Sequence, residues 1–202
     1  SGSRFIVGID EVGYGPVAGP VVVGAVSLHE NQQFAGATDS KLLTETRRER
    51  LAYQIRQESF AWCVAAASAR EIERLNIRGA AILAMRRALA RLPFEADLIL
   101  VDGNPVPGLA NHRSIVGGDR LCHSIACASI LAKVTRDEVM RRLDPRYPAY
   151  GWVSNKGYLT QKHVKAIYEH GPTPHHRKTF RGVLQTELNL STPDVEERYG
   201  HG

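Results

Sequence analysis

The sequence predicts an α/β fold, and three observations support this class. Short apolar runs typical of strands occur near residues 5–9, 21–26, 62–67 and 97–101, and stretches with apolar residues at helical spacing lie between or after them. The run at 97–101 is almost continuously apolar, as expected for a central strand buried on both faces. With 202 residues and 43% hydrophobic residues, the chain is long enough to bury a sizeable core.

The composition favours a partner that carries negative charge. The formal net charge is +5 at pH 7, which suits nucleic acid. No apolar segment approaches the about 20 residues of a membrane span, and no signal-peptide pattern opens the chain, so we expect a cytoplasmic protein. The three cysteines are odd in number and lack metal-ligand spacing, which predicts reduced thiols.

The first strand ends on two adjacent carboxylates, Asp10 and Glu11. The turn after them is too glycine-rich for a helix, because it contains Gly13, Gly15, Gly19, Pro16 and Pro20. Carboxylates at the end of a buried strand are costly without a cation, and a hard divalent metal is a common partner; the alternative is that they only cap the turn. Adjacent strand residues point to opposite faces, so we expect either a bend at the turn or an indirect role for one acid.

The middle of the chain reads as helices, a strand and a second acidic site. Thr44 is a candidate N-cap of a helix to Glu58, and Ser68 with Glu71 forms a capping box that opens a helix interrupted at Asn76 and Gly79. The apolar run at 97–101 then ends on Asp102. Ligand chemistry in α/β folds gathers at the carboxyl ends of such strands, although Asp102 can also be read as a turn residue.

A Gly/Pro-rich connection at 105–118 leads to Asp119 and to a helix from about Ser124 to Leu143. Small residues dominate the early turns of this helix, which predicts close packing on the sheet. From Pro145 the composition shifts to Tyr, Pro, Gly, Lys and His, which indicates a smaller subregion at 145–202 after the region at 1–144.

In this C-terminal subregion, Thr160 is expected to cap a helix through His170. His175 and His176 are expected in a solvated basic loop, because imidazoles do not match a carboxylate metal site. Residues after about Gln185 lose periodicity, and no partner-binding motif is evident in residues 184–202.

Six separated motifs resemble those of the bacterial ribonuclease HII family, the type 2 ribonucleases H, and occur in the family's order. They are Asp10–Pro16 with Ala18–Val21, Asp39–Leu42, Val101–Gly103, Ala126–Val134 with Arg136–Asp137, Tyr147–Tyr158 and His175–Phe180. Two positions depart from the family pattern. Tyr14 stands where the family has arginine, and Cys127 where alanine is usual.

The resemblance implies a ribonuclease H-like fold: a mixed five-stranded sheet of three antiparallel and two further parallel strands, flanked by helices, with a C-terminal helical extension. Residues 1–144 would be the catalytic core and 145–202 a subregion that helps to bind substrate. The implied activity is cleavage of the RNA strand of RNA–DNA hybrids, and cleavage 5′ of single ribonucleotides embedded in duplex DNA, leaving 3′-hydroxyl and 5′-phosphate ends. We expect these nucleic acids as partners, no protein partner, and a monomer.

The resemblance also assigns residues. Asp10, Glu11, Asp102 and Asp119 would hold two Mg²⁺ or Mn²⁺ ions, and such ions lie about 3.5–4 Å apart in two-metal sites. Asp119 is preferred to Asp137, which can be explained by an ion pair. The expected substrate contacts are the backbone of Gly13, Tyr14 and Gly15 at the 2′-OH, Ser40, Lys41 and Lys133 along the phosphates, and Tyr158 at the RNA–DNA junction. A hybrid-binding module without catalysis, and a metal-dependent nuclease for Holliday junctions, remain the alternatives.

Overall fold

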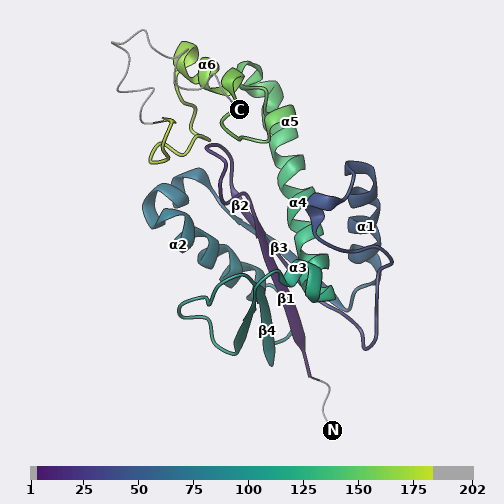
Figure 1. Cartoon of the computed structure of the whole chain (residues 1–202). Helices are drawn as coiled ribbons and strands as arrows, with labels where there is room; N and C mark the ends of the chain where they lie inside the picture. Colours follow the sequence, from purple (N-terminus) through teal and green to yellow (C-terminus); the bar gives the residue numbers. More distant parts are fainter. Residues whose placement is uncertain (1–3, 184–202) are drawn as a thin grey trace.

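The computed structural model describes residues 4–183 and contains one mixed five-stranded sheet (Figure 1). The strand order is β3-β2-β1-β4-β5. The strands are β1 (Ile6–Val12), β2 (Val21–Ser27), β3 (Ala61–Ala67), β4 (Leu98–Asp102) and β5 (His112–Ile115). Pairing is antiparallel from β3 through β2 to β1 and parallel from β1 through β4 to β5. The predicted combination of three antiparallel and two further parallel strands is therefore confirmed.

Helices cover both faces of this sheet. They are α1 (Glu45–Glu58), α2 (Ala69–Leu89), α3 (Gly118–Leu121), α4 (His123–Leu143), α5 (Trp152–Asn155) and α6 (Gln161–His170), with 3-10 turns η1 (Ser40–Leu42), η2 (Asp144–Arg146) and η3 (Pro148–Tyr150). The helix α2 packs on one face, whereas α4 packs on the other with α1 outside it. Figure 1 shows α5 and α6 at the far end of α4, near the turn between β1 and β2.

Two strand glycines let α4 lie directly on the sheet. A Cβ atom on Gly24 would stand 2.2 Å from the carbonyl oxygen of Ala128, and one on Gly8 would stand 2.3 Å from the carbonyl carbon of Ser124. No side chain fits such gaps, so the small residues of α4 meet bare strand backbone. This close approach brings Ser129 of α4 to Asp10 of β1.

The predicted helix starts are confirmed by their caps. Thr44 accepts a hydrogen bond from the Arg47 N–H, Thr160 accepts one from the His163 N–H, and Ser68 with Glu71 forms the complete capping box. Asn76 interrupts α2 with a φ of 56°. One element was missed, because β5 lies inside the stretch read as an irregular connection.

The segment after α4 has an apolar cluster of its own. Trp152, Tyr150 and Ile167 pack there with Met140 of α4 and with Val17 and Ala18 of the turn between β1 and β2. Consequently this subregion is fixed both to α4 and to the glycine turn. The expectations for the tail after about Gln185 and for a partner motif at 184–202 lie outside the described residues.

Two further expectations concern the cysteines and the membrane. All three cysteines, Cys63, Cys122 and Cys127, are free thiols, as predicted. None of the helices within residues 4–183 has the length and apolar character needed to cross a membrane.

Candidate active site

The sheet brings Asp10 and Asp102 side by side. In the parallel pair of β1 and β4, Ile9 lies opposite Val101, so the next residue of each strand is an aspartate. Residues in register on parallel strands point to the same face, which here is the α4 face. The carboxyl ends of β1 and β4 thus carry neighbouring acids, as the sequence predicted.

Asp10 is buried, with 6% of its surface exposed. Its carboxyl group is hydrogen-bonded to the Ser129 hydroxyl and to the Glu11 N–H. Burial, with the nearby Glu11 carboxyl adding to it, raises the pKa of Asp10 from 3.8 to about 8. The Ser129 and Ser40 hydroxyls are themselves hydrogen-bonded, with 3.0 Å between their oxygens. Ser40 was expected along the phosphates, but its side chain is buried behind Asp10 and contacts it through Ser129.

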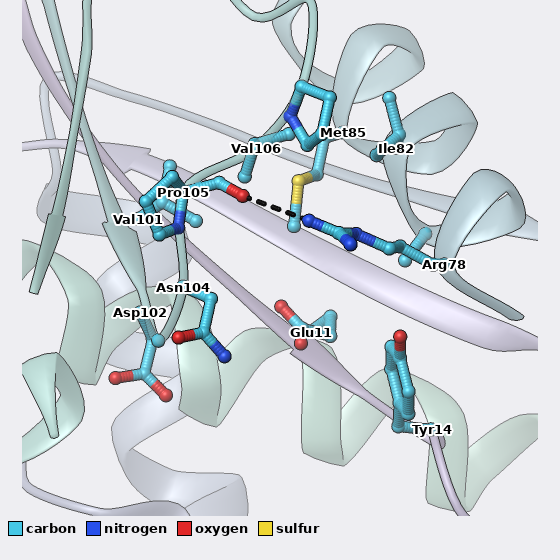
Figure 2. Close-up of a pocket in the computed structure, with 13 residues that line it drawn as sticks. Glu11, Tyr14, Arg78, Ile82, Met85, Val101, Asp102, Asn104, Pro105 and Val106 are labelled. Atoms are coloured by element: carbon cyan, nitrogen blue, oxygen red, sulfur yellow. Dashed lines mark hydrogen bonds between the residues drawn. The ribbon is translucent and has the colours of Figure 1, made fainter. Parts of the chain in front are cut away.

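Glu11 faces the opposite side of β1. The strand stays paired with β2 through Val12, so no bend separates Glu11 from Asp10. Glu11 lines a cavity of about 620 Å³ together with Tyr14, Asp102 and Arg78 of α2, as Figure 2 shows. Its Oε2 atom is buried without a hydrogen-bond partner among residues 4–183. Burial and the Asp102 carboxyl raise the pKa of Glu11 to about 7, against a smaller opposing effect of Lys41.

Asp119 lies close to Asp102 through a short turn. The Gly118 N–H donates to Asp102 Oδ1 at 2.6 Å, which fixes the start of α3 against the end of β4. Burial, together with the carboxylates of Asp39 and Asp102, raises the pKa of Asp119. By contrast, Asp137 accepts from Lys133 Nζ at 2.7 Å within α4. The ion pair proposed for Asp137 is present, and it engages the Lys133 ammonium that was expected at a phosphate.

These carboxyl groups suit a hard divalent cation. Such ions take oxygen ligands, and the raised pKa values show that burial and mutual repulsion disfavour the charged acids when no cation is near. The unpartnered Glu11 Oε2 has unused acceptor capacity. Within residues 4–183, no three His, Cys, Asp or Glu side chains are already gathered around one point. The acids therefore lie around the ends of β1 and β4, but within residues 4–183 they do not form a complete set of metal ligands.

The glycine turn lies beside this acidic site. Tyr14 is 43% exposed and lines the same cavity as Glu11 and Asp102 (Figure 2). Gly13 has a φ of 95°, a value that favours glycine. Behind the turn, Arg177 donates to the carbonyl oxygens of Gly13 and Tyr14. The turn is thus held from inside while its outer side remains open.

Two further loops reach the site. Lys41 is exposed on η1 and close enough to Glu11 and Asp119 to favour their charged forms. Its loop is held by buried Arg48, which donates to the carbonyl oxygens of Ser40 and Leu43.

Tyr158 lies next to the glycine turn on the other side. The residue is 51% exposed, and a Cβ atom on Gly15 would stand 3.8 Å from Tyr158 Cε1. The Gly157 carbonyl accepts from the N–H groups of Val17 and Ala18, so the two loops form one unit.

The expectation of a solvated basic loop at His175 and His176 was wrong for His176. The side chains of His176 and Arg177 are buried, and His176 Nε2 lies 3.0 Å from His163 Nε2. The other ring nitrogen of His163 lies 2.8 Å from the Tyr158 carbonyl oxygen. Burial, with His163 and His175 adding to it, lowers the pKa of His176 to about 3, so the ring is neutral at pH 7.

The residues that sequence reasoning missed are Ser129, Arg48 and Arg177. Each supports a predicted site residue or its loop from a buried position. Ser129 and Arg177 lay inside motifs that had been quoted, but nothing in the sequence showed which backbone carbonyl or carboxyl they contact.

Comparison with solved structures establishes the class. The fold resembles the ribonuclease H2 of Pyrococcus horikoshii, with a TM-score of 0.77 and 24% identity, covering 92% of this chain and 98% of that one. It also resembles Bst-RNase HIII in complex with Mn²⁺, with a TM-score of 0.68 and 18% identity, covering 94% and 71%. At these identities the likeness shows the fold, which is the α/β fold of a ribonuclease H.

Sequence comparison is more specific. The family model described as Ribonuclease HII matches residues 7–185. A ribonuclease HII of Cereibacter sphaeroides is 50% identical over 195 residues, covering 94% of this chain and 92% of the relative. The chain therefore belongs to the ribonuclease HII family, the type 2 ribonucleases H, which are hydrolases of the RNA strand in RNA–DNA hybrids.

Proposed function

We propose that this enzyme cleaves both the RNA strand of hybrids and duplex DNA on the 5′ side of a single embedded ribonucleotide. The observation that carries the proposal is the juxtaposition, around one cavity, of the acids Glu11 and Asp102 with the exposed turn at Tyr14. Acids that can hold metal lie next to backbone groups that can approach a ribose. The site therefore combines phosphodiester hydrolysis with contact to the sugar.

Asp10, Glu11, Asp102 and Asp119 would hold two Mg²⁺ or Mn²⁺ ions, with Glu11 contributing from the opposite side of β1 through the cavity that it shares with Asp102. The Mn²⁺ bound to the related Bst-RNase HIII supports this choice. When bound, such ions lower the pKa of water and neutralise charge on the phosphate. In the hydrolysis, water adds to phosphorus, the bond from phosphorus to the 3′ oxygen breaks, and that oxygen takes up a proton. The products carry 3′-hydroxyl and 5′-phosphate ends.

The other residues orient the substrate. Backbone groups of Gly13, Tyr14 and Gly15 would contact the 2′-OH, which distinguishes RNA from DNA. Lys41, exposed beside the acids, would contact a phosphate. Lys133 would do so only by exchanging its Asp137 partner, and the Ser40 hydroxyl would act through Ser129 on Asp10.

The C-terminal subregion at 145–202 would contribute Tyr158. Its exposed ring beside Gly15 would stack at the junction between ribonucleotide and deoxyribonucleotide.

A cleavage assay tests the proposal. Three substrates are compared with Mg²⁺, with Mn²⁺ and with chelator: an RNA–DNA hybrid, a DNA duplex with one ribonucleotide, and an all-DNA four-way junction. We expect metal-dependent cleavage of the first two only. Cleavage of the junction, or binding without cleavage, would instead support the two alternative functions.

Substitution of single acids tests the ligand assignment. Asp102→Asn should keep the hydrogen bond from Gly118 but lose nearly all cleavage, because a ligand charge is removed. Asp119→Asn should reduce activity far more than Asp137→Asn, which removes one end of an ion pair. The reverse order would assign the fourth ligand to Asp137.

A further inference from the structure

Arg177 is a fully buried arginine next to the glycine turn. Its side chain is 0% exposed, and no carboxylate within residues 4–183 forms an ion pair with it. Instead its guanidinium donates three hydrogen bonds to backbone carbonyls: Nε to Gly19 at 3.0 Å, Nη1 to Tyr14 at 3.1 Å and Nη2 to Gly13 at 2.6 Å. A buried guanidinium is costly unless it is hydrogen-bonded, and here the glycine turn accepts one hydrogen bond from each of its three nitrogens.

This arrangement dictates where the turn's own donors point. The peptide bonds from Gly13 to Tyr14 and from Tyr14 to Gly15 are trans. In a trans peptide, the C=O of one residue and the N–H of the next point in opposite directions. Because the carbonyls of Gly13 and Tyr14 point inward to Arg177, the N–H groups of Tyr14 and Gly15 point outward.

The two outward N–H groups are available to a ligand. Neither has a hydrogen-bond partner within the described part of the chain, and both residues are exposed. They lie between the cavity that contains Glu11 and the ring of Tyr158. A ribose bound with its phosphate at the acids would meet them with its 2′-OH, whose oxygen accepts hydrogen bonds.

We propose that Arg177 is a positioning residue for recognition of the 2′-OH. It fixes the Gly13 and Tyr14 carbonyls, and the peptide planes then aim the Tyr14 and Gly15 N–H groups at the substrate. Arg177 itself is too deeply buried to touch nucleic acid. The inference rests on the proposed function, since it concerns how the same site distinguishes ribose from deoxyribose.

The chain offers a matched control in Arg136. This arginine is 1% exposed and also donates three hydrogen bonds to carbonyls, those of Pro20, Ala18 and Lys156. It packs against the Cα atom of Gly13 but holds neither the Gly13 nor the Tyr14 carbonyl. Arg136→Lys therefore makes the same substitution at a similarly buried position, but it leaves the hydrogen bonds to the Gly13 and Tyr14 carbonyls in place.

The experiment compares Arg177→Lys with Arg136→Lys in the cleavage-inactive Asp102→Asn background with Mg²⁺. Affinity is measured for a duplex with one ribonucleotide and for the all-DNA duplex of the same sequence, and thermal unfolding is recorded for each protein. We expect Arg177→Lys to lower the ratio of the two affinities about tenfold with little change for all-DNA, because one ammonium cannot reach all three carbonyls. Arg136→Lys should keep the ratio at a comparable loss of stability.

Each outcome decides a separate question. A ratio that Arg177→Lys leaves intact, or that both arginine variants lower equally, would overturn the positioning role. If the Asp102→Asn protein with both arginines intact binds the two duplexes equally, the proposed recognition of the 2′-OH is wrong.

If Arg177→Lys does not fold, amide hydrogen exchange on the protein with native Arg177 decides. The Tyr14 and Gly15 N–H groups should exchange fast in the free protein and become protected by the ribonucleotide duplex only. Protection by neither duplex, or equally by both, would reject the inference.

Discussion

Replacing Glu11 by glutamine should remove a pH-dependent instability of the metal-free protein. Burial raises the pKa of Glu11 from 4.5 to about 7, so the folded protein keeps a proton that the unfolded chain has released. When the native state binds more protons than the unfolded state, stability falls as pH rises. The stability of the wild type should therefore decline between about pH 4.5 and pH 7, and Glu11→Gln should lack this contribution.

The size of the effect follows from the same shift. A difference of about 2.5 between the folded and unfolded pKa values corresponds to about 3 kcal/mol above pH 7. The glutamine amide is also buried in the cavity wall, and an unsatisfied polar group costs about 1–3 kcal/mol at every pH. The change of stability with pH is therefore the sharper measure. Glu11→Gln also lowers the pKa of Asp10, because the Glu11 carboxyl helps to raise it, and this adds to the difference between the two proteins in the same direction.

Urea unfolding in the presence of chelator, at about pH 5 and about pH 8, measures this difference. We expect the stability of Glu11→Gln relative to wild type to increase by about 2–3 kcal/mol between the two pH values. Glu30→Gln, which removes an exposed carboxyl, is the control for loss of one charge. Saturating Mn²⁺ should stabilise the wild type more than Glu11→Gln, because a bound ligand stabilises the state that binds it. Identical pH dependence in the two proteins would refute the assignment of a buried, repelled carboxyl.

Three further predictions concern the two tyrosines beside the glycine turn and the packing of α4 on the sheet. Tyr158→Ala should reduce cleavage at a single ribonucleotide more than hybrid binding, since stacking contributes about 1–3 kcal/mol and phosphates supply most affinity; equal loss on every nucleic acid would make Tyr158 a packing residue. Tyr14→Arg should tighten binding with a steeper salt dependence, and an unchanged slope in a salt series would show that position 14 does not meet phosphate. Gly24→Ala should lower stability by about 1–3 kcal/mol or more in thermal unfolding, whereas Gly15→Ala, whose Cβ has its nearest neighbour at 3.8 Å, should not.

Sequence reasoning succeeded where the signal is local. The strands that carry Asp10 and Asp102 are marked by apolar runs, and the helices capped by Thr44 and Thr160 are marked by capping residues within a few positions. The structure contains these elements because the apolar residues that predict them are also the residues that pack in the core. The resemblance added the combination of three antiparallel and two further parallel strands, which local patterns do not contain.

The failures share a physical cause, which is contact between distant parts of the chain. β5 has the sequence His-Arg-Ser-Ile, without an apolar run, and is a strand because it pairs with β4 at the edge of the sheet. His176 and Arg177 are polar in sequence but buried, because their partners lie in His163 and in the glycine turn. When the hydrogen-bond partners of a buried polar residue are distant in the sequence, no hydrophobic periodicity near that residue indicates its burial.

The hydrogen bonds from Arg177 to the glycine turn have a consequence for the order of folding. It joins residues 164 positions apart, Gly13 and Arg177, whereas the four acids all lie within the first 119 residues. Closing so long a loop carries a larger entropic penalty than forming the hairpin of β1 and β2. During synthesis the acids therefore leave the ribosome well before the residue that fixes the turn. We expect selectivity for ribose to mature last, and pulsed hydrogen exchange during refolding should show β1 protected before the Arg177 guanidinium closes on the turn.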